Sequence, residues 1–141
     1  MNDYFARFNA SPASFKKSFF MLVVAWIAHP LFLLSLFQGN TTVPGAEQAI
    51  MRMAIVSLCL AFLLFLIKKW ARALVVVGNL FVVVNDLFYF VAIPHSSIAT
   101  LLCVVVAVFA TFGMYWLFVR ETRDYFNTVN PEKNPAGDAG A

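Results

Sequence analysis

The chain has 141 residues, of which 62% are hydrophobic and only 12% are charged. Soluble domains are about half apolar and roughly a quarter charged, so this chain has too few charges to cover a water-soluble globule. Its formal net charge is +3 at pH 7 and its mean hydropathy is +0.80. The basic excess does not indicate nucleic-acid binding, because that function needs a basic face on a soluble domain.

The N-terminal segment, residues 1–18, precedes the apolar part of the chain. Tyr4, Phe5 and Phe8 fall on one side of a short helix that an Asn or Asp at its start could cap. Such a helix would lie in the cytoplasmic interface of a membrane. A loose leader with incidental aromatic residues explains the same pattern equally well.

Four apolar runs follow, and each is long enough to cross the ~30 Å hydrocarbon core of a bilayer as a helix. Transmembrane strands would be shorter and would alternate apolar with polar residues, whereas these runs are apolar on every side. In lipid the backbone must satisfy its hydrogen bonds within each segment, which favours helices at this length. The predicted fold is all-α, a polytopic bundle of four transmembrane helices within residues 19–119. The helices are expected at about 19–37, 49–67, 71–93 and 98–119.

Basic residues are distributed unevenly around these runs. Nine of the ten Lys and Arg precede the first helix, flank the turn between the second and third, or follow the fourth. The exception, Arg52, can snorkel to the opposite interface. The positive-inside rule therefore predicts that both termini and the KKWAR turn are cytoplasmic. Trp70 and Arg72 at this turn, and Arg52 on the other side, are the predicted interface anchors.

The C-terminal segment, residues 120–141, is polar. The stretch FVRETRDYFN is expected to continue the fourth helix beyond the membrane, with Arg120 and Asp124 four residues apart, where they can pair. Tyr125 and Phe126 would return to the interface. The final NPEKNPAGDAGA contains nothing apolar to bury, which predicts a disordered tail.

A polar stripe on the third helix holds the first candidate functional residues. At about 100° per residue, Asn79, Asn85, Asp86 and Tyr89 fall on one face, which Arg72 and Gly78 share. A charge near the bilayer centre costs at least ~3 kcal/mol. The polar stripe must therefore face other helices, another subunit or a wet cavity.

The first helix supplies one further candidate, His29, next to a proline that frees a backbone carbonyl. At 1.5 Å per residue, His29 lies about 18 Å above Lys17. Asn79 has nearly the same height on the third helix, and Asp86 lies several ångströms higher. The sequence therefore predicts a cluster of His29, Asn79 and Asp86 if the first and third helices touch.

Two interpretations of this cluster compete. In the structural one, the polar side chains join helices by hydrogen bonds of about 0.6 to 2 kcal/mol each. In the functional one, Asp86 and His29 titrate, and they relay a proton or bind a cationic substrate. The structural role is the more frequent one for lone polar residues in small membrane proteins.

The sequence predicts no cofactor, no metal site and no enzymatic activity. Two histidines without a helical His-x-x-x-His or a Cys-x-x-Cys spacing give no metal site, and His95 lies in a loop too far above His29 to share a haem iron. Cys59 and Cys103 differ by roughly 12 Å in height, which excludes a disulfide. Phosphate loops, nucleophile elbows and long hydrophilic loops are also missing from the sequence.

Two stretches of the second half carry a resemblance. KKWARALVVVGNLF, followed after the last helix by YWLFVRETRDYFN, resembles small uncharacterised bacterial inner-membrane proteins with four helices. In these a basic Trp-Ala-Arg turn opens the third helix, matched here by Trp70, Ala71 and Arg72. An aromatic-flanked charged stretch closes the fourth, matched here by residues 120–126. The resemblance implies a multi-pass protein of a bacterial inner membrane and carries over no catalytic or binding residue.

Four helices make a thin bundle with little interior for a transport pathway. We therefore expect partners besides the lipid bilayer, either other membrane subunits or further copies of the chain. The leading hypothesis is a noncatalytic accessory or scaffold subunit, held by helix packing, with the polar stripe as its contact face. The alternative is a small proton-coupled transporter or channel that works as an oligomer around Asp86 and His29.

Overall fold

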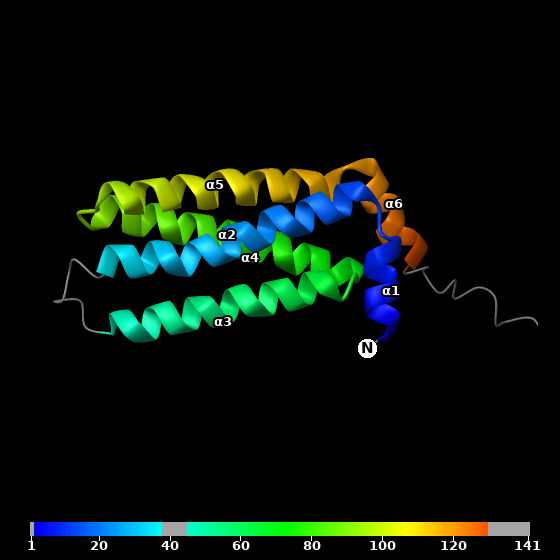
Figure 1. Ribbon diagram of the computed structural model, residues 1–141, viewed down its shortest axis with the longest axis horizontal. Coiled ribbons are helices and arrows are strands. Elements are labelled where there is room, and N and C mark those ends of the chain that lie inside the picture. The colour runs from blue at the N-terminus through cyan, green and yellow to red at the C-terminus, as the bar shows by residue number, and fades with distance from the viewer. Residues whose placement is uncertain (1, 38–44, 130–141) are drawn as a thin grey trace, which may run out of the picture.

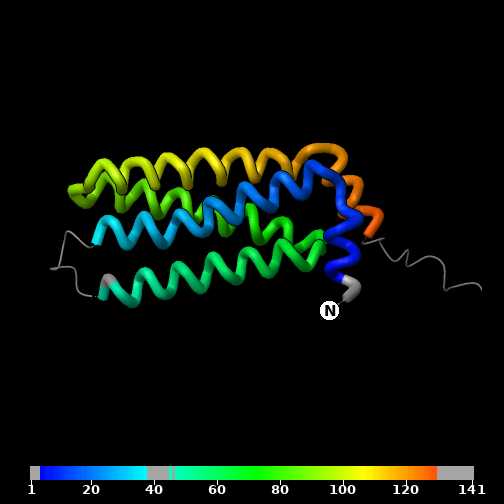
Figure 2. The backbone as a smooth tube through the Cα atoms, viewed as in Figure 1, coloured from blue at the N-terminus to red at the C-terminus, as the bar shows by residue number. Residues whose placement is uncertain are grey.

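The computed structural model describes residues 2–37 and 45–129, and within these ranges the chain is all-α with six helices. Figure 1 shows the long helices side by side and the short helices at one end of the bundle, and Figure 2 follows the same path as a tube. The predicted all-α fold is confirmed. The helices are α1 (Asn2–Ala10), α2 (Ala13–Phe37), α3 (Ala46–Phe65), α4 (Lys69–Ala92), α5 (Ser97–Phe118) and α6 (Arg120–Val129).

The long helices α2, α3, α4 and α5 are each long and apolar enough to cross a membrane. They coincide with the four predicted spans, although their ends differ by several residues. α2 begins at Ala13 because its first turns are buried, with Phe15 and Ser18 both fully covered. Insertion into a membrane and the side on which the termini lie stay predictions.

The turn after α3 contains an unusual backbone conformation. Ile67 has φ of 50°, in the left-handed region that β-branched side chains rarely adopt. Its side chain is nevertheless fully buried in the apolar core. α3 therefore ends at Phe65, short of the predicted end, because packing of Ile67 into the core holds the turn in a conformation that glycine normally supplies.

The four long helices form a ring in which α2 and α4 are diagonal partners. α2 packs mainly against α5 and α3, and α4 packs against the same two helices. We call the end with α1 and α6 the termini end, and the opposite end, where α2 stops and α4 turns into α5, the loop end (Figure 1). Side chains that α2 and α4 direct inward meet across the centre of the bundle.

The closest packing joins α2 to α5. Ser18 donates a 2.7 Å hydrogen bond from its hydroxyl to the backbone carbonyl of Gly113. A Cβ atom placed on Gly113 would lie 2.6 Å from Cγ of Leu22, so only glycine fits there without displacement. Small residues at such positions let helix backbones approach, which is the usual source of tight association in membranes.

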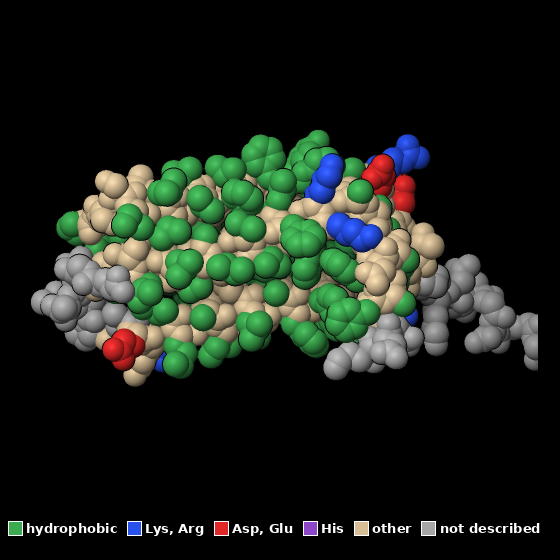
Figure 3. All heavy atoms as spheres, viewed as in Figure 1, with side chains coloured by type: hydrophobic (Ala, Val, Ile, Leu, Met, Phe, Trp, Pro, Cys, Tyr) green, Lys and Arg blue, Asp and Glu red, His purple; other side chains and the backbone are tan. Residues whose placement is uncertain are grey.

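Apolar side chains cover the long sides of the bundle. On the face shown in Figure 3, hydrophobic side chains spread over the long helices, while charged side chains gather near the ends. Only 17% of the apolar span of α3 and 22% of that of α4 are buried within the chain, against 44% for α2. α2 is therefore the central helix, and the outer surface suits contact with lipid.

The termini end is closed by α1 and α6, which pack on the start of α2. Phe8 of α1 makes an edge-to-face contact with Phe15, and Phe126 of α6 makes another. Thr122 donates a 2.9 Å hydrogen bond to the hydroxyl of Ser14, and both side chains are buried. Whether α1 lies in a membrane interface stays a prediction.

The contact between α1 and α6 also includes Tyr125, whose hydroxyl donates a hydrogen bond to the backbone carbonyl of Arg7. Burial raises the pKa of the Tyr125 phenol, and the positive charge of Arg7 opposes part of this change. The two short helices are thus joined by a group that is uncharged over the neutral pH range.

Residues 120–129 are helical, as the sequence predicts, but they form a separate helix instead of continuing the fourth one. α5 ends at Phe118, and Val119 adopts an extended ψ of 142° before α6 begins. The break lets Phe126 reach Phe15, which a straight helix would not allow. The predicted pair of Arg120 and Asp124 is present at 3.6 Å on an exposed face. The predicted disordered tail, residues 130–141, lies outside the described residues.

Candidate functional site

His29 of α2 and Asp86 of α4 meet in the interior of the bundle. Nδ1 of His29 lies 2.7 Å from Oδ1 of Asp86, and the two side chains are 0% and 2% exposed. The two atoms lie within ion-pair distance, but their geometry is not that of an aligned hydrogen bond. The structure thus brings His29 together with Asp86, which the sequence placed several ångströms higher, and not with Asn79, which it placed at nearly the same height.

The pair is held between the two helices without other polar support. Nε2 of His29 and Oδ2 of Asp86 are buried and have no hydrogen-bond partner among the described residues. A buried polar atom without a partner costs about 1 to 3 kcal/mol. The site therefore has unused capacity to accept or donate a hydrogen bond.

Asn79 lies below the pair, toward the termini end, and makes a second contact across the bundle. The indole Nε1 of Trp26 donates a 3.0 Å hydrogen bond to Oδ1 of Asn79, and Nδ2 of Asn79 donates a 2.9 Å bond to the carbonyl of Val75. Both side chains are buried. Asn79 therefore hydrogen-bonds to α2 and to its own helix, and neither of these bonds involves His29 or Asp86.

Sequence reasoning missed Trp26 as the partner of Asn79, although a signal was present. Trp26 precedes His29 by three residues and Asn79 precedes Asp86 by seven, so each pair of positions shares one helix face. Two helices that meet at His29 and Asp86 must also bring Trp26 toward Asn79. A tryptophan that is buried in an apolar core usually needs such a partner for its N–H group.

Two residues of the polar stripe face the bundle interior, and a role of the stripe as a contact face for a partner protein stays a prediction. Asn79 and Asp86 point into the bundle and are covered by its own helices. Asn85 and Tyr89 are only partly buried, and the ring of Tyr89 packs edge-on against Phe37 of α2. The sequence required the stripe to avoid lipid, and α2 satisfies this requirement from within the chain.

The predicted interface anchors lie near the two ends of the bundle. Trp70 is 52% exposed at the start of α4, and Arg52 is exposed near the start of α3. The guanidinium of Arg72 lies 5.5 Å from the ring centre of Phe126 in α6, a contact that the sequence did not indicate. Their role as membrane anchors stays a prediction.

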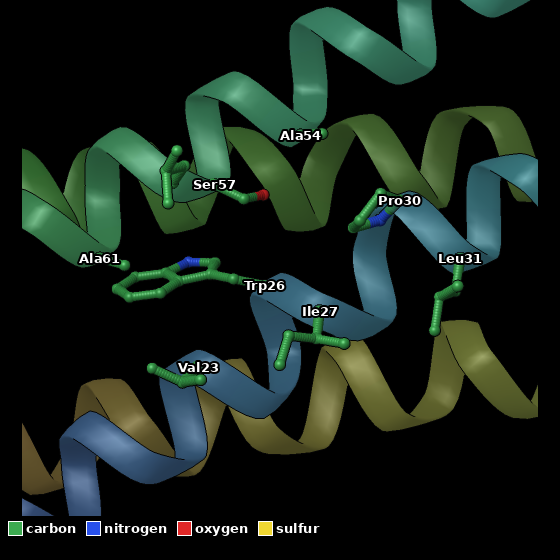
Figure 4. A pocket seen from close by; sticks show the side chains of 9 residues that line it. Val23, Trp26, Ile27, Pro30, Leu31, Ala54, Ser57 and Ala61 are labelled. Atoms are coloured by element: carbon green, nitrogen blue, oxygen red, sulfur yellow. The ribbon is translucent and has the colours of Figure 1, made fainter.

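A cleft of about 390 Å³ opens between α2 and α3 beside the polar contacts. Figure 4 shows Trp26 and Pro30 on one side of it and Ser57 on the other. The ring of Trp26 lines this cleft while its N–H group binds Asn79. The hydroxyl of Ser57 is buried and has no hydrogen-bond partner among the residues that the structure describes.

Within residues 2–37 and 45–129 there is no group of three or more His, Cys, Asp or Glu side chains that could hold a metal ion. Cys59 is exposed and Cys103 is buried, and both are free thiols, as their different heights predicted. No protein-family model, curated protein or solved structure matches this chain. Its function is therefore argued from the geometry of the His29 and Asp86 contact.

Proposed function

We propose that the chain is a multi-pass protein of a bacterial inner membrane, with both termini cytoplasmic, that works as a small proton-coupled transporter or channel. The observation that carries this proposal is the 2.7 Å contact between His29 and Asp86 in the bundle interior. The distribution of Lys and Arg supports the orientation, and four apolar helices support the membrane location.

The chemistry of the pair favours a proton-binding role over simple joining of helices. Burying two ionisable groups costs several kcal/mol each, and replacing such a pair with well-packed apolar residues is often neutral or stabilising. Trp26 and Asn79 already join α2 to α4 with groups that do not titrate. A second link made of an imidazole and a carboxyl adds little to packing, but it adds a place to hold a proton.

The pair can change charge in either direction. With one proton shared between them, His29 and Asp86 are neutral overall, either as an ion pair or as two uncharged groups. A second proton leaves a net positive charge in the core, and loss of the shared proton leaves a net negative charge. Both charged states are costly in an apolar interior. Gain or loss of a proton therefore changes the free energy of the contact between α2 and α4.

The test is proton flux into vesicles that contain the purified protein and a pH-sensitive dye. We expect wild-type vesicles to equilibrate an imposed pH gradient faster than empty vesicles, and Asp86→Asn to abolish this difference. Asp124→Asn is the matched control, because Asp124 is an exposed carboxylate outside the long helices. Equal rates for wild-type and empty vesicles would refute a transport or channel role.

A noncatalytic accessory subunit is the second candidate, and the exposure of α3 favours it. α3 buries the smallest share of its apolar span among the four long helices, so a helix from another protein could cover it. In this case the wild-type protein should co-purify with a membrane partner in mild detergent. A bulky or charged substitution at Leu58, which is 72% exposed, should then weaken co-purification, whereas Asp86→Asn should not.

A further inference from the structure

The His29 and Asp86 pair lies much closer to one end of the bundle than to the other. Along α2, His29 is about 12 Å from the end at Phe37 and about 24 Å from the start at Ala13, at 1.5 Å per residue. Along α4, Asp86 is about 9 Å from the end at Ala92 and about 25 Å from the start at Lys69. Both helices place the pair near the loop end.

The packing on the two sides of the pair is also unequal. Toward the termini end lies most of the larger apolar cluster, and the hydrogen bond between Trp26 and Asn79 crosses the bundle on that side of the pair. Toward the loop end lies a smaller cluster around Phe32, Leu36 and Cys103. The polar side chain of Tyr89, one turn beyond Asp86, is only partly buried. The barrier to a proton is therefore thinner on the loop side.

We propose that His29 and Asp86 exchange their proton with the loop end of the bundle, and that the Trp26 and Asn79 hydrogen bond closes the route to the termini end. This inference rests on the proposed proton-coupled function, and it adds the direction from which the proton arrives. The pair is closed to solvent, at 0% and 2% exposure, so the structure corresponds to an occluded state whose thinner cover lies on the loop side.

Within the part of the chain that the structure describes, few other titratable groups surround the pair. On α5 the buried thiol of Cys103 is near enough to Asp86 to interact with it electrostatically. On α4 the phenol of Tyr89 lies one turn away, and the buried residues described on α3, such as Ser57, carry no charge. Among the buried residues of α2, His29 is the one with an ionisable side chain. A response to pH in this region therefore reports the pair.

Trp26 offers a reporter inside the site. It lies three residues from His29 on the same face of α2, and a charge that appears or disappears near an indole ring changes its fluorescence. Trp70→Phe and Trp116→Phe would leave Trp26 as the single tryptophan. Both replaced residues lie outside the pair, at the start of α4 and near the end of α5.

The experiment varies pH on one side of vesicles that contain this single-tryptophan protein. The internal pH is held by buffer while the external pH is moved between about 4 and 9, the range of ordinary carboxyl and imidazole titration. Protease digestion of the termini measures which fraction of the molecules has the loop end outside. We expect the fraction of the Trp26 response that follows external pH to equal this loop-outside fraction.

The other outcomes separate the inference from the function on which it rests. A response that follows the termini side, or both sides equally, would overturn the loop-side direction and leave the proton-binding function intact. Absence of any response, even when an ionophore equalises pH, would overturn the proton-binding function itself. Asp86→Asn in the same background should lose the response, and Asn79→Leu should make the pair respond to pH on both sides.

Discussion

Replacing His29 and Asp86 together should separate stability from function. The double variant His29→Leu with Asp86→Ala keeps nearly the same total side-chain volume in the core and removes both titratable groups. Each single change leaves one buried polar group without its partner, which costs about 1 to 3 kcal/mol in its neutral form and about 3 to 5 kcal/mol if it stays charged. The two side chains are 0% and 2% exposed, so solvent does not reduce these costs.

The double variant should instead be as stable as the wild-type protein or more stable by up to about 4 kcal/mol, because no unpaired group remains. The coupling energy between the two positions should therefore be at least about 2 kcal/mol. Unfolding in detergent micelles, followed by circular dichroism, measures all four proteins of the cycle. The double variant should also show no proton flux in vesicles.

Either of two results would refute this reasoning. Additive costs, with the double variant less stable than both single variants, would mean that the 2.7 Å contact carries no specific interaction. Retained proton flux in a stable double variant would mean that protons cross the protein without the pair. Stability and flux are measured on the same preparation, so a loss of flux that is caused by unfolding can be recognised.

Three further predictions concern the bundle around the pair. Asn79→Leu should lower the free energy of unfolding in detergent by about 1 to 3 kcal/mol, because it removes the hydrogen bond between α2 and α4 and leaves the buried N–H of Trp26 without a partner; an unchanged free energy would contradict a role for this bond. Gly113→Ala should cost about 1 to 3 kcal/mol, because its Cβ would lie 2.6 Å from Cγ of Leu22 and 3.3 Å from its backbone nitrogen. Gly78→Ala should cost less, because its Cβ meets side-chain atoms alone; equal costs in the same unfolding assay would contradict this difference. The raised pKa of Tyr125 means that its contribution to the α1 and α6 contact is present below pH ~10 and is lost as pH rises through the folded pKa. Proteolysis of α1 should therefore accelerate at high pH in the wild-type protein but show no such transition in Tyr125→Phe.

The number and type of the long helices could be predicted because lipid leaves the chain few alternatives. Segments of about 20 apolar residues must satisfy their own backbone, so length and composition were enough to find α2 to α5. The meeting of His29 and Asp86 was predictable for a related reason. Regular helices convert residue numbers into approximate heights, and polar groups on helices that avoid lipid tend to find each other. The heights were only approximate, because His29 pairs with Asp86 and not with Asn79, the residue predicted at its own height.

The features that the sequence did not predict depend on contacts between distant segments. Neither a glycine nor a proline marks the break at Val119, which follows from the packing of Phe126 on Phe15. The left-handed conformation of Ile67 likewise depends on burial of its side chain. The two buried residues of the polar stripe could face a partner or the bundle interior, and only the diagonal placement of α2 and α4 decides between these alternatives.

The polar contacts of α2 indicate which helices would move if the pair changes its charge. Ser18 ties α2 to Gly113 of α5 through a buried hydrogen bond and close backbone packing, and neither depends on a proton. Trp26 and His29 tie α2 to α4, where direct helix packing is slight and one of the two links titrates. A change in protonation therefore weakens the α2 and α4 contact while it leaves α2 bound to α5. We expect α2 to stay with α5 and α3, its main packing partners, while α4 moves against them, so a cross-link between α2 and α5 should preserve proton flux. A cross-link between α2 and α4 should stop it, and the opposite pattern would rule out this division of the bundle.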